Sequence, residues 1–322
     1  MNLLVSMRYL VALDEHKHFA RAAQACFITQ PALSNALKAL EEEFGSPIVK
    51  RSRTFVGFTP EGERLLESAR RMLREEQLLK QDLKSVDGQI QGQLSIGFVP
   101  SAEPVAARFA ALLQARHPGI TPIVSSMSSQ DIEERLHDLT LDLGLGFIER
   151  ARPGVKGRSH DGAGALQMLP QYTEHYFLVR RVGTEQGLAD KALTLGQPIA
   201  WQEAAELSLC LMSPDMYNRH IVDEAFAQVG VRVQPVLETN SVLSLALTAL
   251  EGTVACIMPG ALVRVLRKMD DRLEIRPLDG PQMQTSVGFM AARVERPSRT
   301  LEAALALAQD AQWLKSIAAH EV

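Results

Sequence analysis

Residues 18–45 read HFARAAQACFITQPALSNALKALEEEFG, and this stretch decides the fold of the N-terminal part of the chain. Apolar side chains recur in it at spacings of four, three and four residues, which predicts one face of a helix: Leu33, Leu37, Leu40 and Phe44. Thr29 is a favourable N-cap, Pro31 suits the first turn, and Gly45 is a natural C-terminal stop. The sequence therefore predicts a helix over about 30–44.

A shorter helix is predicted just before it, because Phe19, Ala22 and Ala23 form a compact apolar face and small alanines let a second helix approach closely. Residues 26–29 are then the turn of a helix-turn-helix. The second helix presents amide, hydroxyl and ammonium groups outward, which are the groups that bind base edges and phosphates. The alternative is an ordinary solvated face. The candidate DNA-binding residues of this stretch are Thr29, Gln30, Pro31, Ser34, Asn35 and Lys38.

Two short apolar runs follow around a basic turn, in SPIVKRSRTFVGFT at 46–59. This pattern predicts a wing beside the helix-turn-helix, with Arg51 and Arg53 placed to enter a minor groove. Residues 1–88 carry 13 Lys and Arg against 12 Asp and Glu, so binding to DNA requires the basic groups to gather on one face.

The order of residues in 19–45, followed by IVKR at 48–51 and FTPEG at 58–62, resembles the N-terminal domain of LysR-type transcriptional regulators. The resemblance implies that residues 1–59 form a winged helix-turn-helix that binds double-stranded operator DNA. It also implies roles for single residues. Bases or nearby backbone would be met by Gln30, Pro31, Ser34 and Asn35, and phosphates or the minor groove by Lys38, Arg51 and Arg53.

A linker helix is predicted over 60–88, where Pro60 starts the helix and acidic residues suit its positive end. A heptad pattern runs along it through Leu65, Ala69, Met72, Glu76, Leu79, Leu83 and Val86. Six of these seven are apolar, which favours a coiled-coil dimer over a helix that lies on its own domain. By family resemblance, effector domains pair in turn and give a homotetramer.

From residue 92 onward strands alternate with helices, which predicts α/β lobes with parallel sheets. LSIGFV, ITPIVSS and LDLGLGFI are strands of lobe one, at about 92–162. LSLCLM, VQPVLE and TVACIMPG are strands of lobe two, at about 163–268. The tail at 269–322 is expected to return to lobe one. Residues 92–322 would then be a two-lobed effector-binding domain like a small periplasmic binding protein, as the resemblance also implies.

Hydroxyl and amide side chains follow several predicted strands and open the next helix. Ligands of open α/β sheets lie beyond the carboxyl ends of strands, and helix N-termini favour anions. Each residue taken singly is more simply a helix cap. Together they predict a cleft for a small carboxylate or similar anion, lined by Ser101, Ser128, Ser129, Phe147, Ser213 and Asn240.

Signatures of enzymes, cofactors and metals are missing from the sequence. It has no G-x-S-x-G and no P-loop, and His16 and His18 lack a third nearby ligand. Cys26, Cys210 and Cys256 are odd in number and far apart, which suits a reducing cytoplasm, and the two in lobe two are interpreted as core thiols. The alternative is that these two thiols sense redox state.

The bulk composition agrees with a globular protein, since 46% of residues are hydrophobic and 22% charged, and no run approaches the length of a membrane span. We therefore predict a ligand-responsive transcriptional regulator without catalytic activity, with RNA polymerase as a further partner. The alternative is a small-molecule binding protein or enzyme whose N-terminal helices serve only for assembly.

Overall fold

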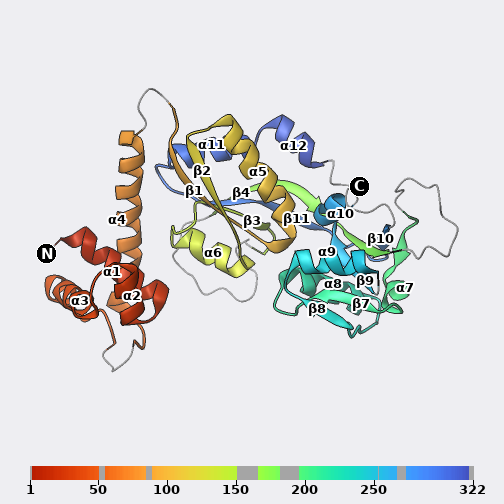
Figure 1. The fold of residues 1–322 in the computed structure, drawn as a ribbon, viewed down its shortest axis with the longest axis horizontal. Coiled ribbons are helices and arrows are strands. Elements are labelled where there is room, and N and C mark those ends of the chain that lie inside the picture. The colour runs from red at the N-terminus through yellow and green to blue at the C-terminus, as the bar shows by residue number, and fades with distance from the viewer. Residues whose placement is uncertain are drawn as a thin grey trace. The chain divides into compact units, whose positions relative to one another are not determined.

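The computed structural model describes residues 2–50, 55–84, 89–150, 166–181, 196–252, 254–266 and 273–318. The chain forms two compact units. Residues 1–89 and 138–140 belong to the first, and residues 90–137 and 141–322 belong to the second. Each unit is described below by itself (Figure 1).

The first unit is built from helices around a small apolar core. The helices are α1 (Leu3–His16), α2 (Phe19–Ala25), α3 (Gln30–Phe44) and α4 (Pro60–Lys84). Met7, Leu10 and Leu13 of α1 are fully buried in this core. Ala22 and Ala23 of α2 are buried beside them, which is the close helix approach that the alanines predict.

Helix α3 begins and ends where the sequence predicts. The Thr29 hydroxyl accepts from the Ala32 N–H at 3.4 Å, and Gly45 ends the helix in the left-handed region with φ of 65°. Leu33, Leu37 and Leu40 are buried. Phe44 lies on the same helix face but is 46% exposed, because it lies in the last turn beyond the core.

The wing begins as predicted, with an antiparallel bridge between Val49 and Phe58. The carboxylate of Glu41 in α3 accepts from the N–H groups of Ile48 and Val49 at 2.8 and 3.2 Å, which ties this segment to α3. Thr59 accepts from the Gly62 N–H at 3.0 Å and so caps α4. The predicted wing residues Arg51 and Arg53 lie outside the described residues.

The second unit holds two sheets, each flanked by helices (Figure 1). In the described part of lobe one, the strand order is β2 (Ile120–Ser126), β1 (Gly92–Phe98), β3 (Leu143–Phe147), β11 (Thr285–Ala292), β4 (Leu166–Glu174). Its helices are α5 (Glu103–Arg116), α6 (Ser129–His137), α11 (Arg299–Ala308) and α12 (Ala311–Ala318), with a 3-10 turn at Pro100–Ala102.

In the described part of lobe two, the strand order is β6 (Ile199–Ala200), β10 (Leu273–Asp279), β5 (Tyr176–Arg181), β9 (Ala255–Pro259), β7 (Leu209–Met212), β8 (Leu237–Thr239). Its helices are α7 (Trp201–Ala205), α8 (Tyr217–Gln228), α9 (Val242–Glu251) and α10 (Gly260–Leu266). Both sheets are mixed rather than parallel, because β11 runs antiparallel to β3 and β4, and β5 runs antiparallel to β9 and β10.

Two strands lie in the lobe opposite to the one expected. Strand β4 falls in the stretch expected for lobe two, but it pairs with β11 in lobe one. Strand β10 falls in the tail expected for lobe one, but it pairs with β5 and β6 in lobe two. The chain therefore crosses between the sheets at His175, directly between β4 and β5, and again at 280–284, between β10 and β11.

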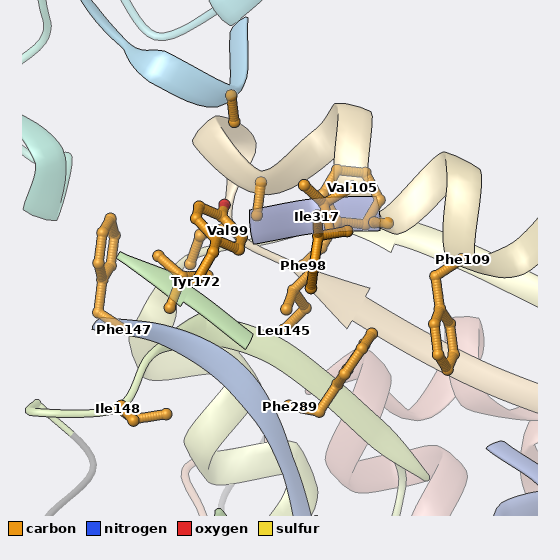
Figure 2. Packing of buried hydrophobic residues seen from close by; sticks show 14 of the residues in the cluster. Phe98, Val99, Val105, Phe109, Leu145, Phe147, Ile148, Tyr172, Phe289 and Ile317 are labelled. Carbon is orange, nitrogen blue, oxygen red and sulfur yellow. The ribbon is translucent and has the colours of Figure 1, made fainter. Parts of the chain in front are cut away.

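Aromatic side chains from the sheet and its helices fill the core of lobe one (Figure 2). The ring of Phe109 in α5 lies 4.3 Å from that of Phe289 in β11 and 5.2 Å from that of Trp313 in α12, measured between centroids. Trp313 also donates from Nε1 to the buried Gln171 at 2.7 Å. The C-terminal helices are thus bound to the sheet that opens the second unit. Among the described helices, none is long and apolar enough to cross a membrane.

Candidate functional site

Helix α3 presents a polar face beside its buried leucines. The side chains of this face are all exposed: Thr29, Gln30, Pro31, Ser34, Asn35 and Lys38. Gln30 and Ser34 are four residues apart and Ser34 and Lys38 are again four apart, so the three lie along one line of the helix surface. This polar face carries hydrogen-bonding groups and one positive charge, spread over a length of helix that a contact in a DNA groove requires.

The predicted heptad of α4 divides into two parts. Ala69 was expected in the dimer seam, but it is fully buried against α1 in the core of its own unit, because α4 packs there through Leu66 and Ala69. Met72 is exposed, and Leu79 and Leu83 are 58% and 73% exposed. Leu65 is half-buried. Val86 lies outside the described residues. The remaining apolar stripe of α4 consists of Leu65, Met72, Leu79 and Leu83.

A pocket of about 270 Å³ lies between the two lobes of the second unit. Its walls come from the ends of β1, β3 and β7, the starts of α6, α8 and α9, and the loops beside them. The lining residues are Val99, Pro100, Ser101, Ser128, Ser129, Gln130, Phe147, Arg150, Met212, Asp215, Met216, Tyr217, Asn218, His220, Val242, Leu245 and Pro259. The space suits a small molecule with an apolar body.

Four of the six predicted effector residues line this pocket: Ser101, Ser128, Ser129 and Phe147. Ser213 and Asn240 do not. The Ser213 N–H donates to the carbonyl of Thr239 at 2.9 Å and so joins the ends of β7 and β8. The next residue after Thr239, Asn240, is exposed. The cap of α9 is Ser241, which accepts from Ser244 N–H at 3.2 Å.

Ser128 and Ser129 are adjacent but differ in what their hydroxyls do. The Ser128 hydroxyl donates to the Asp131 carboxylate at 2.7 Å and accepts from the Asp131 N–H at 3.1 Å, so it is the N-cap of α6. The Ser129 hydroxyl is buried and has no hydrogen-bond partner in the described structure. A buried hydroxyl without a partner is costly, and a ligand acceptor in the pocket would satisfy it.

The charged side of the pocket is formed by Arg150 together with two aromatic rings. The Arg150 guanidinium lies 5.5 Å from the centre of the Tyr217 ring, and Nε is 3.5 Å from the Glu133 carboxylate. The rings of Phe147 and Tyr217 are 5.0 Å apart. Burial raises the pKa of Tyr217, more than Arg150 lowers it, so its hydroxyl keeps its proton. The pocket thus offers a cation and a neutral donor beside apolar surface.

The sequence did not indicate the contribution of residues 212–220 to the pocket. Met216, Tyr217 and Asn218 lie where a strand ends and α8 begins, and Asn218 also donates to the Tyr176 hydroxyl at 3.3 Å. The available signal was the turn SPDMYN between a predicted strand and a predicted helix. The sequence prediction there rested on a hydroxyl at the start of a helix, whereas aromatic and thioether side chains form this wall of the pocket.

The cysteines lie away from the pocket. Cys210 and Cys256 are fully buried and face each other in register on β7 and β9. The contact with Cys210 and burial raise the pKa of the Cys256 thiol far above its usual range. Burial also raises the pKa of Cys26, at the end of α2. The contact with Cys256 instead lowers the pKa of Cys210. The core interpretation of Cys210 and Cys256 agrees with the full burial of both side chains.

Buried Glu174 occupies the crossing between the lobes. Its Oε1 accepts from the Ala261 N–H at 3.3 Å at the start of α10. Burial raises the pKa of this carboxyl to about 8, more than nearby backbone N–H groups and Tyr172 lower it. Burial also keeps the pKa of Tyr172 and of Tyr176 well above 10, so both tyrosines stay neutral.

Comparison with known curated proteins gives partial matches to transcription factors. The chain is 34% identical over 140 residues to the hydrogen peroxide-inducible genes activator of Haemophilus influenzae, covering 43% of this chain and 46% of the relative. It is 33% identical over 153 residues to the SDS degradation transcriptional activation protein of a Pseudomonas strain, covering 47% and 50%. The chain therefore spans about half the length of the curated relatives it matches.

Solved structures show the same fold along nearly the whole chain. A full-length OxyR variant from Pseudomonas aeruginosa aligns with a TM-score of 0.65 at 22% identity, covering 98% of this chain and 97% of the other. Full-length CbnR complexed with its target DNA aligns with a TM-score of 0.59 at 16% identity, covering 97% and 99%. These likenesses confirm the predicted fold class.

Two family models match this chain in order. The bacterial regulatory helix-turn-helix protein model of the lysR family matches residues 4–63, which include α1, α2 and α3. The LysR substrate binding domain model matches residues 87–313, which include both lobes and the pocket. The chain therefore belongs to the lysR family of bacterial regulatory helix-turn-helix proteins.

Proposed function

We propose that this protein is a transcriptional regulator that binds double-stranded operator DNA through α3 and responds to a small anionic effector in the pocket. The observation that supports this most directly is the exposed stripe of Gln30, Ser34 and Lys38 on a helix that is held in place by the buried Leu33, Leu37 and Leu40. Such a helix enters a major groove as a rigid body, with its N-terminal residues toward the base edges. The solved complex of CbnR with its target DNA supports the proposal at the level of the fold.

The proposed contacts divide by chemistry. Gln30, Ser34 and Asn35 are expected to meet base edges, because amides and hydroxyls form the hydrogen bonds that distinguish bases. Lys38 is expected to contact a phosphate, together with the wing residues Arg51 and Arg53. Thr29 and Pro31 set the start of α3 and bring its first turn against the DNA backbone.

Gln30→Ala is expected to weaken binding to the preferred duplex by about 1–3 kcal/mol and to relax preference at one base pair. The glutamine side chain carries no charge, so the dependence of binding on salt should stay as in the parent. Fluorescence anisotropy on a duplex selected from a random-sequence pool measures both quantities. Lys38→Ala is the matched comparison, since it should weaken binding to all duplexes and flatten the salt dependence. Equal weakening of Gln30→Ala on every sequence would move Gln30 to the backbone contacts.

The effector we propose is a small carboxylate with an apolar or aromatic body. Arg150 supplies positive charge, Tyr217 and Ser129 supply donors, and Phe147 with Tyr217 supplies aromatic surface. Ser101 is buried beside the start of α5 and completes the polar side of the pocket. A ligand here touches both lobes, so it can shift their arrangement only if it binds one arrangement better than another.

Ser129→Ala is expected to weaken binding of a carboxylate effector by about 10- to 150-fold, because a hydrogen bond to a charged group contributes roughly 1.5–3 kcal/mol. Calorimetry against a panel of small aromatic and aliphatic carboxylates measures this. Ser128→Ala is the matched control, since its hydroxyl caps α6, and it should lower stability more than affinity. If Ser129→Ala binds the same ligand as tightly as the parent, the hydroxyl faces no ligand.

Several relatives are named for induction by hydrogen peroxide. In this chain none of the three cysteines, all within the described residues, lines the pocket. The geometry therefore favours reversible binding of an effector over thiol chemistry in the pocket. We propose a binding function without catalysis, exercised in the cytoplasm where the DNA and RNA polymerase are.

We propose assembly into a homotetramer. The apolar stripe of α4 would pair two chains as an antiparallel or parallel helix pair. The second unit leaves apolar side chains exposed at two separate edges, on β2 and on β8 with α9: Ile123, Val124, Val236, Leu237, Leu243 and Leu247. The β2 edge of one chain would pair with the β8 and α9 edge of a second copy. A twofold axis relates the two copies, so the same contact forms twice.

A further inference from the structure

The turn that leads into α3 holds an aromatic residue in an unusual position. Helix α2 ends in a Schellman motif, in which Ile28 N–H donates to the Ala23 carbonyl and Phe27 N–H donates to the Gln24 carbonyl, both at 3.0 Å. The motif places Phe27 in the left-handed region, with φ of 55°. Glycine is the usual residue there, because a side chain is strained in that conformation.

The ring of Phe27 contributes nothing to the core of its own unit. Its exposed fraction is 95%, whereas Cys26 and Ile28 on either side of it pack against the core. The same unit also ends α1 and α3 in the left-handed region, with Lys17 at φ of 47° and Gly45 at φ of 65°, so a polar residue or glycine serves where only a helix stop is needed. A bulky residue with positive φ is an outlier, and such outliers cluster at functional sites.

We propose that Phe27 is a further DNA-contacting residue and that its ring packs against the C5-methyl group of a thymine at the edge of the sequence bound by α3. Phe27 stands two and three residues before Thr29 and Gln30, the first exposed residues of the polar face. A side chain projecting from this turn lies where the N-terminal end of α3 enters the major groove. The thymine methyl is the apolar group that this groove offers.

This contact gives a signature that separates it from a phosphate contact. An apolar contact releases no counterions, so loss of the ring lowers the binding constant without changing its dependence on salt. It also depends on one methyl group of the DNA. Replacement of that thymine by deoxyuridine, which lacks the methyl, should weaken binding by the parent about fourfold, as expected for burial of one such group.

The test compares Phe27→Gly and Phe27→Asn with the parent, in the full chain. Both replacements suit the left-handed conformation, so neither should lower the melting temperature. On a duplex selected by the parent from a random-sequence pool, both variants should bind about tenfold or more weakly, with the parental salt dependence. Deoxyuridine is then placed at each thymine in turn. One position should weaken the parent and leave Phe27→Gly unaffected.

The inference rests on the proposed DNA-binding function, and the two fail differently. A parent that enriches no duplex overturns the proposed function and, with it, this contact. If the parent and Phe27→Gly bind the duplex equally well, only the proposed thymine contact is overturned. The exposed ring then contacts a protein partner. A parent insensitive to every deoxyuridine, or a flattened salt dependence in Phe27→Gly, also overturns it, because the ring then meets sugar and phosphate.

Discussion

Glu174→Gln is expected to remove most of the decline in stability that the parent's second unit shows as pH rises from about 5 to about 8. The pKa of Glu174 is about 8 in the folded protein, against an ordinary value of 4.5. Between these values the folded domain keeps a proton that the unfolded chain releases. The contribution of Glu174 to the free energy of unfolding is therefore greatest below about pH 4.5. It falls between about pH 4.5 and about pH 8 and does not change further above pH 8.

The expected difference is large, because one unit of pKa corresponds to about 1.4 kcal/mol, which gives at most about 5 kcal/mol over this range. Glutamine resembles the protonated carboxyl in shape and cannot lose a proton. Denaturant unfolding of the parent and the variant at a series of pH values measures the difference. Parallel curves for the two proteins would show that Glu174 ionises with an ordinary pKa.

The two buried tyrosines beside Glu174 do not complicate this experiment. Tyr172 and Tyr176 contribute nothing below pH 9, because burial holds the pKa of each well above 10.

Leu79→Asp combined with Leu83→Asp is expected to halve the assembly, from a tetramer to a dimer held by the effector domains. The two leucines are the most exposed members of the α4 stripe, so two charges there would be buried in the proposed helix pair at several kcal/mol. Binding to a duplex with two half-sites should fall by about 100-fold, because the second DNA-binding domain is no longer held beside the first. Sedimentation velocity and anisotropy give the two results.

Gln77→Asp is the matched control, because Gln77 is exposed on the same helix but off the stripe. It should sediment and bind as the parent does. Folding of the first unit is not at risk in the double variant, since α4 contributes to its core through Leu66 and Ala69, which lie ten or more residues before Leu79. A double variant that sediments with the parent would remove the α4 stripe from the interface.

Local chemistry determined what could be predicted from the sequence. Helix α3 was predicted from residue 30 to residue 44 because Thr29 and Gly45 fix its two ends through backbone hydrogen bonds within a few residues. The same holds for the Thr59 cap of α4. Four pocket residues were found because the ends of strands and the starts of helices carry a local signature.

Long-range pairing explains what could not be predicted. Nothing within β10 specifies whether it joins the sheet of β5 or that of β3, since both offer apolar partners. The strands β4 and β5 were missed because the chain runs from one into the other through His175 alone, without a turn signal. Tyr217 and Met216 reach the pocket because α8 starts under it, which depends on how two lobes close. In the sequence, Ala69 suits either the dimer seam of α4 or the core of the first unit. Its packing against α1 places it in the core.

The crossing between lobes has a consequence for how this architecture diverges. Glu174 and Thr285 are direct partners across the β4–β11 ladder, so the chain leaves lobe one and returns to it at the same rung. Topologically, everything from Tyr176 to Asp279 is an insertion into a β-hairpin. The hairpin remains closed whatever the insertion contains. Such a domain can exchange or remodel its inserted half, and with it one wall of the pocket, while the hairpin and the helices packed on it keep their sequence. New ligand preferences are then open to evolution, or to a chimaera between relatives, without redesign of the remaining half.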